Sequence, residues 1–173
     1  NYAEAYAKLE FHNTYYLAYR DLPELILEHV KGRKAIDFGC GTGRSTRFLQ
    51  KLGFDAIGID ISEDMIKKAR EIDPEGDYSL IKDDNFNQLQ KNTFDLVLSA
   101  FTFDNIPTME KKLKLFRQIR NLLTSEGAIV NLVSSPEIYV NEWASFSTKD
   151  FPQNKSARSG LNLFGCLCQG RRM

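Results

Sequence analysis

The chain has 173 residues, of which 42% are hydrophobic, enough for one compact domain with a core and too few for two domains of ordinary size. Its 23 basic and 23 acidic residues give a formal net charge of zero, which argues against binding nucleic acid through bulk electrostatics. No stretch approaches the roughly 18 consecutive apolar residues of a membrane span, and no basic-then-apolar leader opens the chain.

The cysteines and histidines do not have the spacing of a structural zinc site. Cys166 and Cys168 are separated by one residue, whereas zinc knuckles and redox pairs use two. His12 and His29 lie far from any cysteine. We therefore expect no metal site and a reducing, cytoplasmic environment. The lack of a long apolar run likewise predicts no membrane association.

Short apolar runs alternate with helical patterns through the middle of the chain. One or two tyrosine-rich helices come first, with Pro23 starting the second. Strands are then expected at residues 35–38, 55–61, 78–81, 94–99 and 128–133, and helices at 45–52, 62–74 and 108–127. This alternation is typical of an α/β fold, a parallel sheet covered by helices on both faces.

Two of these helices have clear start signals. Ser62 is a good N-cap, with Glu63 and Asp64 placed in the positive first turn. Thr108 can cap the long helix that Gly127 ends. The apolar face of that helix is expected to consist of Met109, Leu113, Phe116, Ile119 and Leu123.

The composition changes after Asp150, the last acidic residue. The tail carries four basic residues and has no hydrophobic period, which favours an irregular or disordered end over a basic anchor for an anionic partner. We therefore divide the chain into an N-terminal helical cover (1–33), a central sheet domain (34–135) and a C-terminal tail (136–173).

A glycine-rich turn after the first strand is the strongest signal. Residues 37–43 read Asp-Phe-Gly-Cys-Gly-Thr-Gly. Glycines at such a turn permit positive φ and let a ligand lie against the main chain, at the sheet edge where α/β proteins bind ligands. The dinucleotide pattern G-x-G-x-x-G would need a third glycine at Arg44, and no lysine follows as in a P-loop.

Residues 36–43 resemble the first motif of the class I S-adenosylmethionine (SAM) methyltransferases at almost every position. The resemblance implies a Rossmann-like, doubly wound parallel sheet of at least five strands in the order 3-2-1-4-5, with SAM as cofactor. It also implies that the loop packs against the methionine part of SAM, whose positive charge suits a nearby acid. The residues concerned are Asp37, Gly39, Cys40, Gly41 and Gly43.

The second strand ends in Asp60, 17 residues after Gly43. A carboxylate there can accept hydrogen bonds from both hydroxyls of a ribose, and the resemblance gives Asp60 that role toward SAM. Ile61 and Met65 would flank the adenine, although Met65 fits a plain core role equally well.

The segment after the third strand supplies the expected adenine contacts. The resembled family carries an Asp or Asn here, followed by an apolar residue. Asp83, Asp84 and Asn85 are three candidates in a row, of which we choose Asp84 or Asn85 together with Phe86. For the pair Asp83 and Asp84, a metal site is an alternative interpretation, and a solvated turn is the commoner fate of such pairs.

The fourth strand and the N-terminal helices would complete the site. The resemblance places Ser99, Ala100 and Phe101 beneath the methionine and the transferred methyl group. Tyr16 and Arg20 fall where the family folds a helical cover, and Arg20 could pair with the SAM carboxylate. No catalytic residue is assigned. Asp104 is the nearest candidate for a base, with a capping role as its alternative.

The expected reaction is methyl transfer to a small-molecule acceptor. The chain lacks the Asn/Asp-Pro-Pro-aromatic string of base-amine methyltransferases and the Pro-Cys pair of cytosine-carbon enzymes, so nucleic acid is disfavoured. A SAM-binding domain without activity and a nicotinamide-dependent oxidoreductase are the alternatives. The antiparallel hairpin that ends the family's seven-stranded sheet is expected to be missing, so the chain would be truncated or altered at its C-terminus.

Overall fold

The computed structural model describes residues 14–82, 85–135, 137, 140–141, 146–147, 149–150, 152 and 166–167. Contacts divide the chain into two compact units, residues 1–133 and 134–173. None of the helices in the described part of the chain is both long and apolar enough to cross a bilayer.

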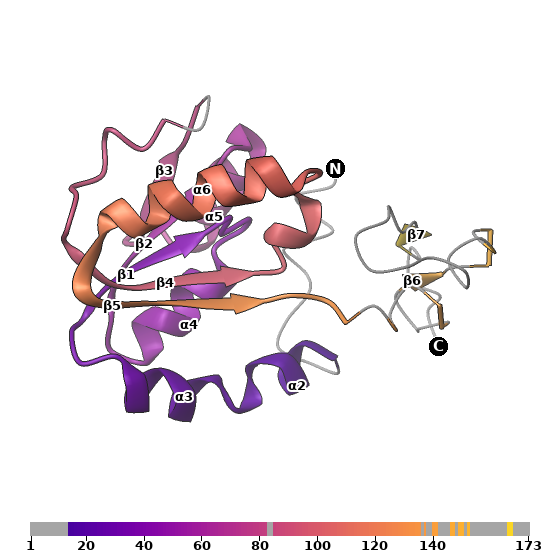
Figure 1. Ribbon diagram of the computed structural model, residues 1–173, viewed down its shortest axis with the longest axis horizontal. Helices are drawn as coiled ribbons and strands as arrows, with labels where there is room; N and C mark the ends of the chain where they lie inside the picture. The colour runs from indigo at the N-terminus through magenta and orange to yellow at the C-terminus, as the bar shows by residue number, and fades with distance from the viewer. Residues whose placement is uncertain are drawn as a thin grey trace. The chain divides into compact units, whose positions relative to one another are not determined.

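The first unit is built on a five-stranded parallel sheet (Figure 1). Its strands lie side by side in the order β3-β2-β1-β4-β5, which confirms the predicted order. Their bounds are β1 Lys34–Phe38, β2 Asp55–Asp60, β3 Asp77–Leu80, β4 Phe94–Ala100 and β5 Leu123–Leu132. Because β1 lies between β2 and β4, the turn after β1 lies where the chain switches direction across the sheet, the usual ligand position.

Helices precede β1 and connect the strands, except between β3 and β4, where the described residues form no helix. The helical segments are α2 Thr14–Arg20, α3 Leu22–His29, α4 Arg44–Lys51, α5 Glu63–Ile72, the 3₁₀ turn η1 Phe103–Asn105 and α6 Met109–Leu122. The Ser62 hydroxyl accepts a hydrogen bond from the Met65 amide, and the Thr108 hydroxyl accepts one from the Lys111 amide. Both N-caps are therefore confirmed.

Apolar side chains cover both faces of the sheet. One face packs against α6 through Ile36, Ile59, Val97, Leu115, Ile119 and Leu122. The other packs against α2, α3 and α4 through Tyr19, Leu22, Ile26, Ala35, Leu49, Leu96 and Leu98. In Figure 1, α6 and α3 lie on opposite sides of the strands. This two-sided burial explains why the strands read as continuous apolar runs.

The buried face of α6 differs from the prediction. Met109 and Leu113 are 68% and 49% exposed, whereas Leu115 and Leu122 are 5% and 3% exposed. The buried positions follow the spacing i, i+4, i+7 from Leu115 through Ile119, which is one helix face. The predicted face began from the apolar residues nearest the N-cap, and these lie on the solvent side.

The end of α6 also differs from the prediction. The helix stops at Leu122, and β5 begins at once, so Gly127 lies inside the strand rather than ending the helix. The pairing of β5 with β4 shifts register between Phe94 and Leu96. A Cβ on Gly127 would lie 2.8 Å from the Phe94 carbonyl oxygen, so glycine permits this close strand approach.

The second unit, taken by itself, contains a short antiparallel pair. Strands β6 (Phe146–Ser147) and β7 (Cys166–Leu167) pair Phe146 with Leu167 and Ser147 with Cys166. They form a two-stranded sheet of their own.

Candidate active site

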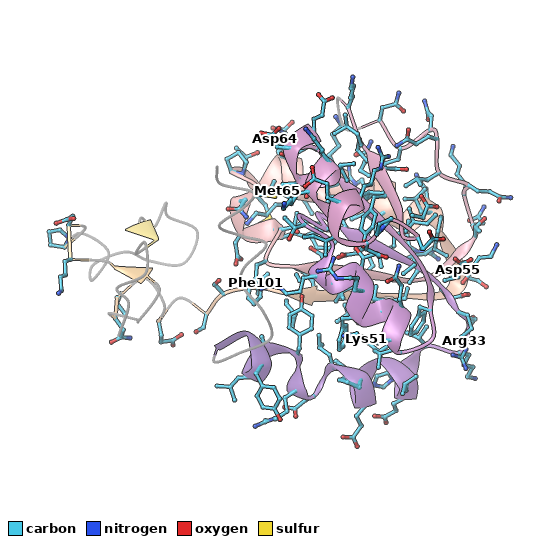
Figure 2. All side chains as sticks on the ribbon, turned by 180° about the vertical axis from the view of Figure 1, so that it is seen from behind. Arg33, Lys51, Asp55, Asp64, Met65 and Phe101 are labelled. Carbon is cyan, nitrogen blue, oxygen red and sulfur yellow. The ribbon has the colours of Figure 1, made fainter. Side chains whose placement is uncertain are left out.

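A pocket of about 540 Å³ opens at the carboxyl ends of the strands. It is lined by Phe38, Gly39, Gly41, Ile59, Asp60, Ile61, Ser62, Met65, Ile81, Phe86, Ala100, Phe101, Thr102, Asn105, Ile106, Pro107, Lys111 and Leu115. Figure 2 shows two of these residues, Met65 and Phe101, at the opposite end of the sheet from Arg33 and Asp55. The volume lies within the range of pockets that hold cofactors and small molecules.

The glycine loop forms one wall of this pocket. Gly39 and Gly41 have φ values of 73° and 54°, a conformation that favours glycine. The amides of Gly39 and Cys40 both donate to the Ile59 carbonyl at 2.8 and 3.0 Å. The loop is thereby bound to the end of β2, and its main chain borders the pocket.

Asp60 connects the loop to the neighbouring strand. Its Oδ2 accepts a hydrogen bond from the Gly41 amide at 2.8 Å, and its Oδ1 accepts one from the Ser62 amide at 2.9 Å. A carboxylate oxygen can accept more than one hydrogen bond. Asp60 therefore retains acceptor capacity toward a ligand in the pocket that it lines.

Asp37 lies beneath the loop and outside the pocket lining. Its side chain is fully buried, and its Oδ2 accepts hydrogen bonds from the hydroxyls of Ser45 and Thr46, each at 2.7 Å. Its Oδ1 has no hydrogen-bond partner among the described residues. Burial raises the pKa of Asp37 from its ordinary 3.8 to about 6, and the two hydroxyls lower it by less. The carboxyl group therefore orders the start of α4 from inside the fold.

The raised pKa of Asp37 predicts that stability falls as the pH rises. The folded state holds this proton up to about pH 6, while the unfolded chain releases it near 3.8, so the stabilisation is full below pH 4 and is lost as the pH rises through 6. A difference of about 2 pKa units corresponds to about 3 kcal/mol. We expect Asp37→Asn, which resembles the protonated form, to exceed wild type by about 2–3 kcal/mol at pH 8 and to match it near pH 4.

Urea unfolding at pH 4, 6 and 8 measures this difference. Asp55→Asn serves as the control, because Asp55 is an exposed carboxylate at the start of β2. A difference between Asp37→Asn and wild type that does not change with pH would contradict the assignment.

The end of β4 forms the wall opposite Asp60. Phe101 has a φ of 63°, which is uncommon for a bulky residue. Its amide donates to the Leu132 carbonyl at 2.9 Å, and its carbonyl accepts from the Asn105 Nδ2 at 3.1 Å. Hydrogen bonds on both sides thus hold this backbone conformation, which is frequent at functional sites.

Eight of the predicted site residues line the pocket together. They are Gly39, Gly41, Asp60, Ile61, Met65, Phe86, Ala100 and Phe101. They come from the loop after β1, from the end of β2 and the following start of α5, from the segment after β3, and from the end of β4. Residues distant in the sequence are brought to one sheet edge, as the parallel topology requires.

Other predicted residues lie outside that lining. Cys40 is 5% exposed and packs with Ile66, Ala69 and Tyr78. A Cβ on Gly43 would lie 2.5 Å from the Tyr78 hydroxyl, and Ser99 is fully buried.

Three further predictions concern exposed or uncertain positions. Asn85 borders a second, polar pocket, and its Oδ1 accepts from the Asn87 amide. Tyr16 is 56% exposed, and Arg20 makes a two-point pair with Asp21. Asp84 lies outside the described residues.

Sequence reasoning missed the residues that follow β4. Thr102, Asn105, Ile106, Pro107, Lys111 and Leu115 all line the pocket. Their signal was positional, since any segment that leaves a strand at the carboxyl edge begins beside the ligand crevice. Lys111 is brought there by the first turn of α6, whose start the Thr108 cap fixes.

The lining suits a nucleoside with a cationic tail. Apolar side chains, among them Ile61, Phe86 and Ile106, provide surfaces for a flat base, and Asp60 provides an acceptor for sugar hydroxyls. The loop at Gly41 lets a ligand approach the main chain where a side chain would stand. The residues present therefore fit SAM.

Comparison with known proteins agrees with this geometry. A family model described as a methyltransferase domain matches residues 36–131, more than half of the chain. The chain therefore belongs to this family, the class I SAM-dependent methyltransferases, whose cofactor is SAM. This confirms the family that the glycine loop indicated.

Two curated relatives and one solved structure illustrate the similarity. Ubiquinone biosynthesis O-methyltransferase from Methylococcus capsulatus is 39% identical over 82 residues, 45% of this chain and 35% of that protein. Cypemycin N-terminal methyltransferase from a Streptomyces species is 34% identical over 103 residues, 57% of this chain and 41% of that protein.

The solved structure is an S-adenosylmethionine dependent methyltransferase from Mesorhizobium loti. It is 29% identical with a TM-score of 0.57, and the match covers 70% of this chain and 56% of that one. The chain thus spans about a third to about a half of the length of these three proteins.

Proposed function

We propose that this protein transfers a methyl group from SAM to a small-molecule acceptor. The observation that carries the proposal is the joint arrangement of the glycine loop and Asp60 on one pocket, with the Gly41 amide bonded to the Asp60 carboxylate. This unit couples the glycine loop, where the ligand meets the protein main chain, to the carboxylate that would accept from its sugar. This arrangement supports binding of SAM in this pocket.

The pocket residues divide into separate binding roles. Asp60 accepts from the ribose, and Ile61, Met65 and Phe86 contact the adenine. The loop at Gly39 and Gly41 and the β4 end at Ala100 and Phe101 border the methionine part. All of these residues line the same cavity. Four other predicted contacts, Asp37, Cys40, Gly43 and Ser99, lie outside the lining and support this wall from within the fold.

Alignment and exclusion of water account for most of the chemistry. SAM supplies a methyl group that is already activated as a sulfonium, so the protein mainly orients the acceptor and keeps water out. The apolar lining from Phe38, Ile106 and Leu115 serves that exclusion. A general base is needed only for an acceptor that must lose a proton. Asp104 stays the nearest acidic candidate, in η1 beside the pocket residue Asn105.

A small acceptor agrees with the shape and charge of the described residues. The pocket measures about 540 Å³, and among the described residues its charged lining consists of Asp60 and Lys111. One relative is named as an O-methyltransferase of ubiquinone biosynthesis, and another as the cypemycin N-terminal methyltransferase. We therefore expect a small molecule, and a peptide amine is the outcome that would replace it.

Binding and transfer are tested in two steps. Isothermal titration with S-adenosylhomocysteine should show one site per chain, and NADH should not compete for it. Transfer of a labelled methyl group from SAM should then mark the small-molecule fraction of a metabolite extract. Absence of binding would contradict the proposal, binding without transfer would leave a SAM-binding domain, and label found only in peptide or nucleic acid would overturn the acceptor class.

A further inference from the structure

The β1–β4 ladder ends before the glycine loop begins. The last paired residues are Asp37 on β1 and Leu98 on β4. The carbonyls of Phe38 and Gly39 therefore lie beyond the ladder and need hydrogen-bond donors from elsewhere, since unpaired buried backbone groups are rare. The sheet itself does not hold this side of the loop.

Thr102 provides that partner from the chain that leaves β4. Its hydroxyl donates to the Phe38 carbonyl at 2.9 Å and lies 3.4 Å from the Gly39 carbonyl. On the other side, the Gly39 and Cys40 amides donate to Ile59 of β2. The Gly39 and Cys40 amides are thus held from β2, and the Phe38 and Gly39 carbonyls from Thr102, two residues beyond the end of β4.

Gly39 and Thr102 are fitted to each other. A Cβ on Gly39 would lie 2.2 Å from the Thr102 Oγ1 and 2.4 Å from its Cγ2. Only glycine lets the threonine approach closely enough to reach both carbonyls. The absence of a side chain at Gly39 therefore serves a neighbour within the protein, whereas Gly41 faces the Asp60 side chain and the pocket.

We propose that Thr102 is a positioning residue that fastens the glycine loop to the end of β4 and so fixes the SAM-binding wall before the cofactor arrives. The consequence of this role for SAM binding rests on the proposed function. The fastening of the loop by Thr102 is a property of the ligand-free protein. A fixed loop raises affinity because less ordering is left to binding.

Three variants separate the effect of the Thr102 hydroxyl from the effect of the side chain's shape and from the general effect of losing a hydrogen bond. Thr102→Val keeps the shape and removes the donor, Thr102→Ser keeps the donor, and Thr93→Val is the matched control. The Thr93 hydroxyl likewise donates to a carbonyl, that of Lys91 at 3.0 Å, just before β4 and outside the pocket lining. Thr93→Val therefore measures the effect of losing such a bond away from the loop.

Hydrogen exchange in the ligand-free protein tests the fastening itself. We expect the Gly39, Cys40 and Gly41 amides to exchange at least fivefold faster in Thr102→Val, at the wild-type rate in Thr102→Ser, and unchanged in Thr93→Val. Equal exchange in Thr102→Val and wild type would overturn the proposal. If Thr102→Val does not fold, Thr102→Ala removes the same donor and decides: faster loop exchange in Thr102→Ala than in Thr102→Ser supports the hydroxyl role, and equal exchange contradicts it.

Titration with S-adenosylhomocysteine tests the consequence for the site. Loss of one hydrogen bond predicts a Kd about three- to tenfold higher in Thr102→Val, with wild-type affinity in Thr102→Ser and Thr93→Val. Unchanged affinity in Thr102→Val would overturn the link to binding. If wild type itself binds no S-adenosylhomocysteine, the proposed function fails, and the exchange experiment still judges the role of Thr102.

Discussion

Gly41→Val is expected to abolish measurable binding of S-adenosylhomocysteine, with an affinity loss of a hundredfold or more. Gly41 lines the pocket and has a φ of 54°. A β-branched side chain in this conformation costs about 1–3 kcal/mol of strain, and its methyl groups would stand where the ligand meets the main chain. The substitution would also displace the Gly41 amide, which donates a hydrogen bond to Asp60. Isothermal titration measures the loss.

Gly53→Val separates loss of the pocket from loss of the fold. Gly53 also has positive φ, 87°, but lies in the turn between α4 and β2, where a Cβ would meet the end of the Arg33 side chain. We expect both variants to lose thermal stability and only Gly41→Val to lose binding. If Gly53→Val lost binding to the same extent, the effect of Gly41→Val would reflect unfolding rather than a blocked site.

The sheet could be predicted because its signals are local or follow from topology. Buried parallel strands read as apolar runs, and the caps at Ser62 and Thr108 mark where helices begin. The strand order followed from the family resemblance. Asp60 was found by its distance from the glycine loop, and the structure joins it to that loop through the Gly41 amide. Its contact with ribose stays a prediction.

Side-chain direction was harder to predict. Asp37 was assigned to the site by its position in the motif, but alternation along β1 turns it toward α4, where Ser45 and Thr46 donate to it. The apolar face of α6 was misread because two phases of the helix carry apolar residues and only packing chooses between them. Propensity does not distinguish such faces.

The walls made by turns after strands were not predictable from residue types. Thr102, Asn105 and Lys111 have no motif of their own, and they reach the pocket because η1 and the start of α6 fold back over the sheet edge. The left-handed backbone at Phe101 gives no signal in a bulky residue. Such positions depend on long-range pairing, here with Leu132.

Asp60→Ala is expected to weaken binding of S-adenosylhomocysteine by about 1–3 kcal/mol, the scale for leaving hydrogen-bonding groups without partners, or about 5- to 150-fold in Kd. Two effects add. The ribose hydroxyls lose their acceptor, and the amides of Gly41 and Ser62 lose the carboxylate that orders them. Isothermal titration near pH 8 measures the change.

Asp95→Ala and Asp60→Asn distinguish these effects from general destabilisation. Asp95 also accepts from a backbone amide, that of Lys34 at 3.0 Å, at the amino end of the sheet away from the pocket. Its loss should lower stability and leave the affinity unchanged. Asp60→Asn places an amide NH₂ toward one of two backbone donors, so we expect an intermediate affinity. If Asp60→Ala bound as tightly as Asp95→Ala, neither effect would operate, and Asp60 would be removed from the binding site.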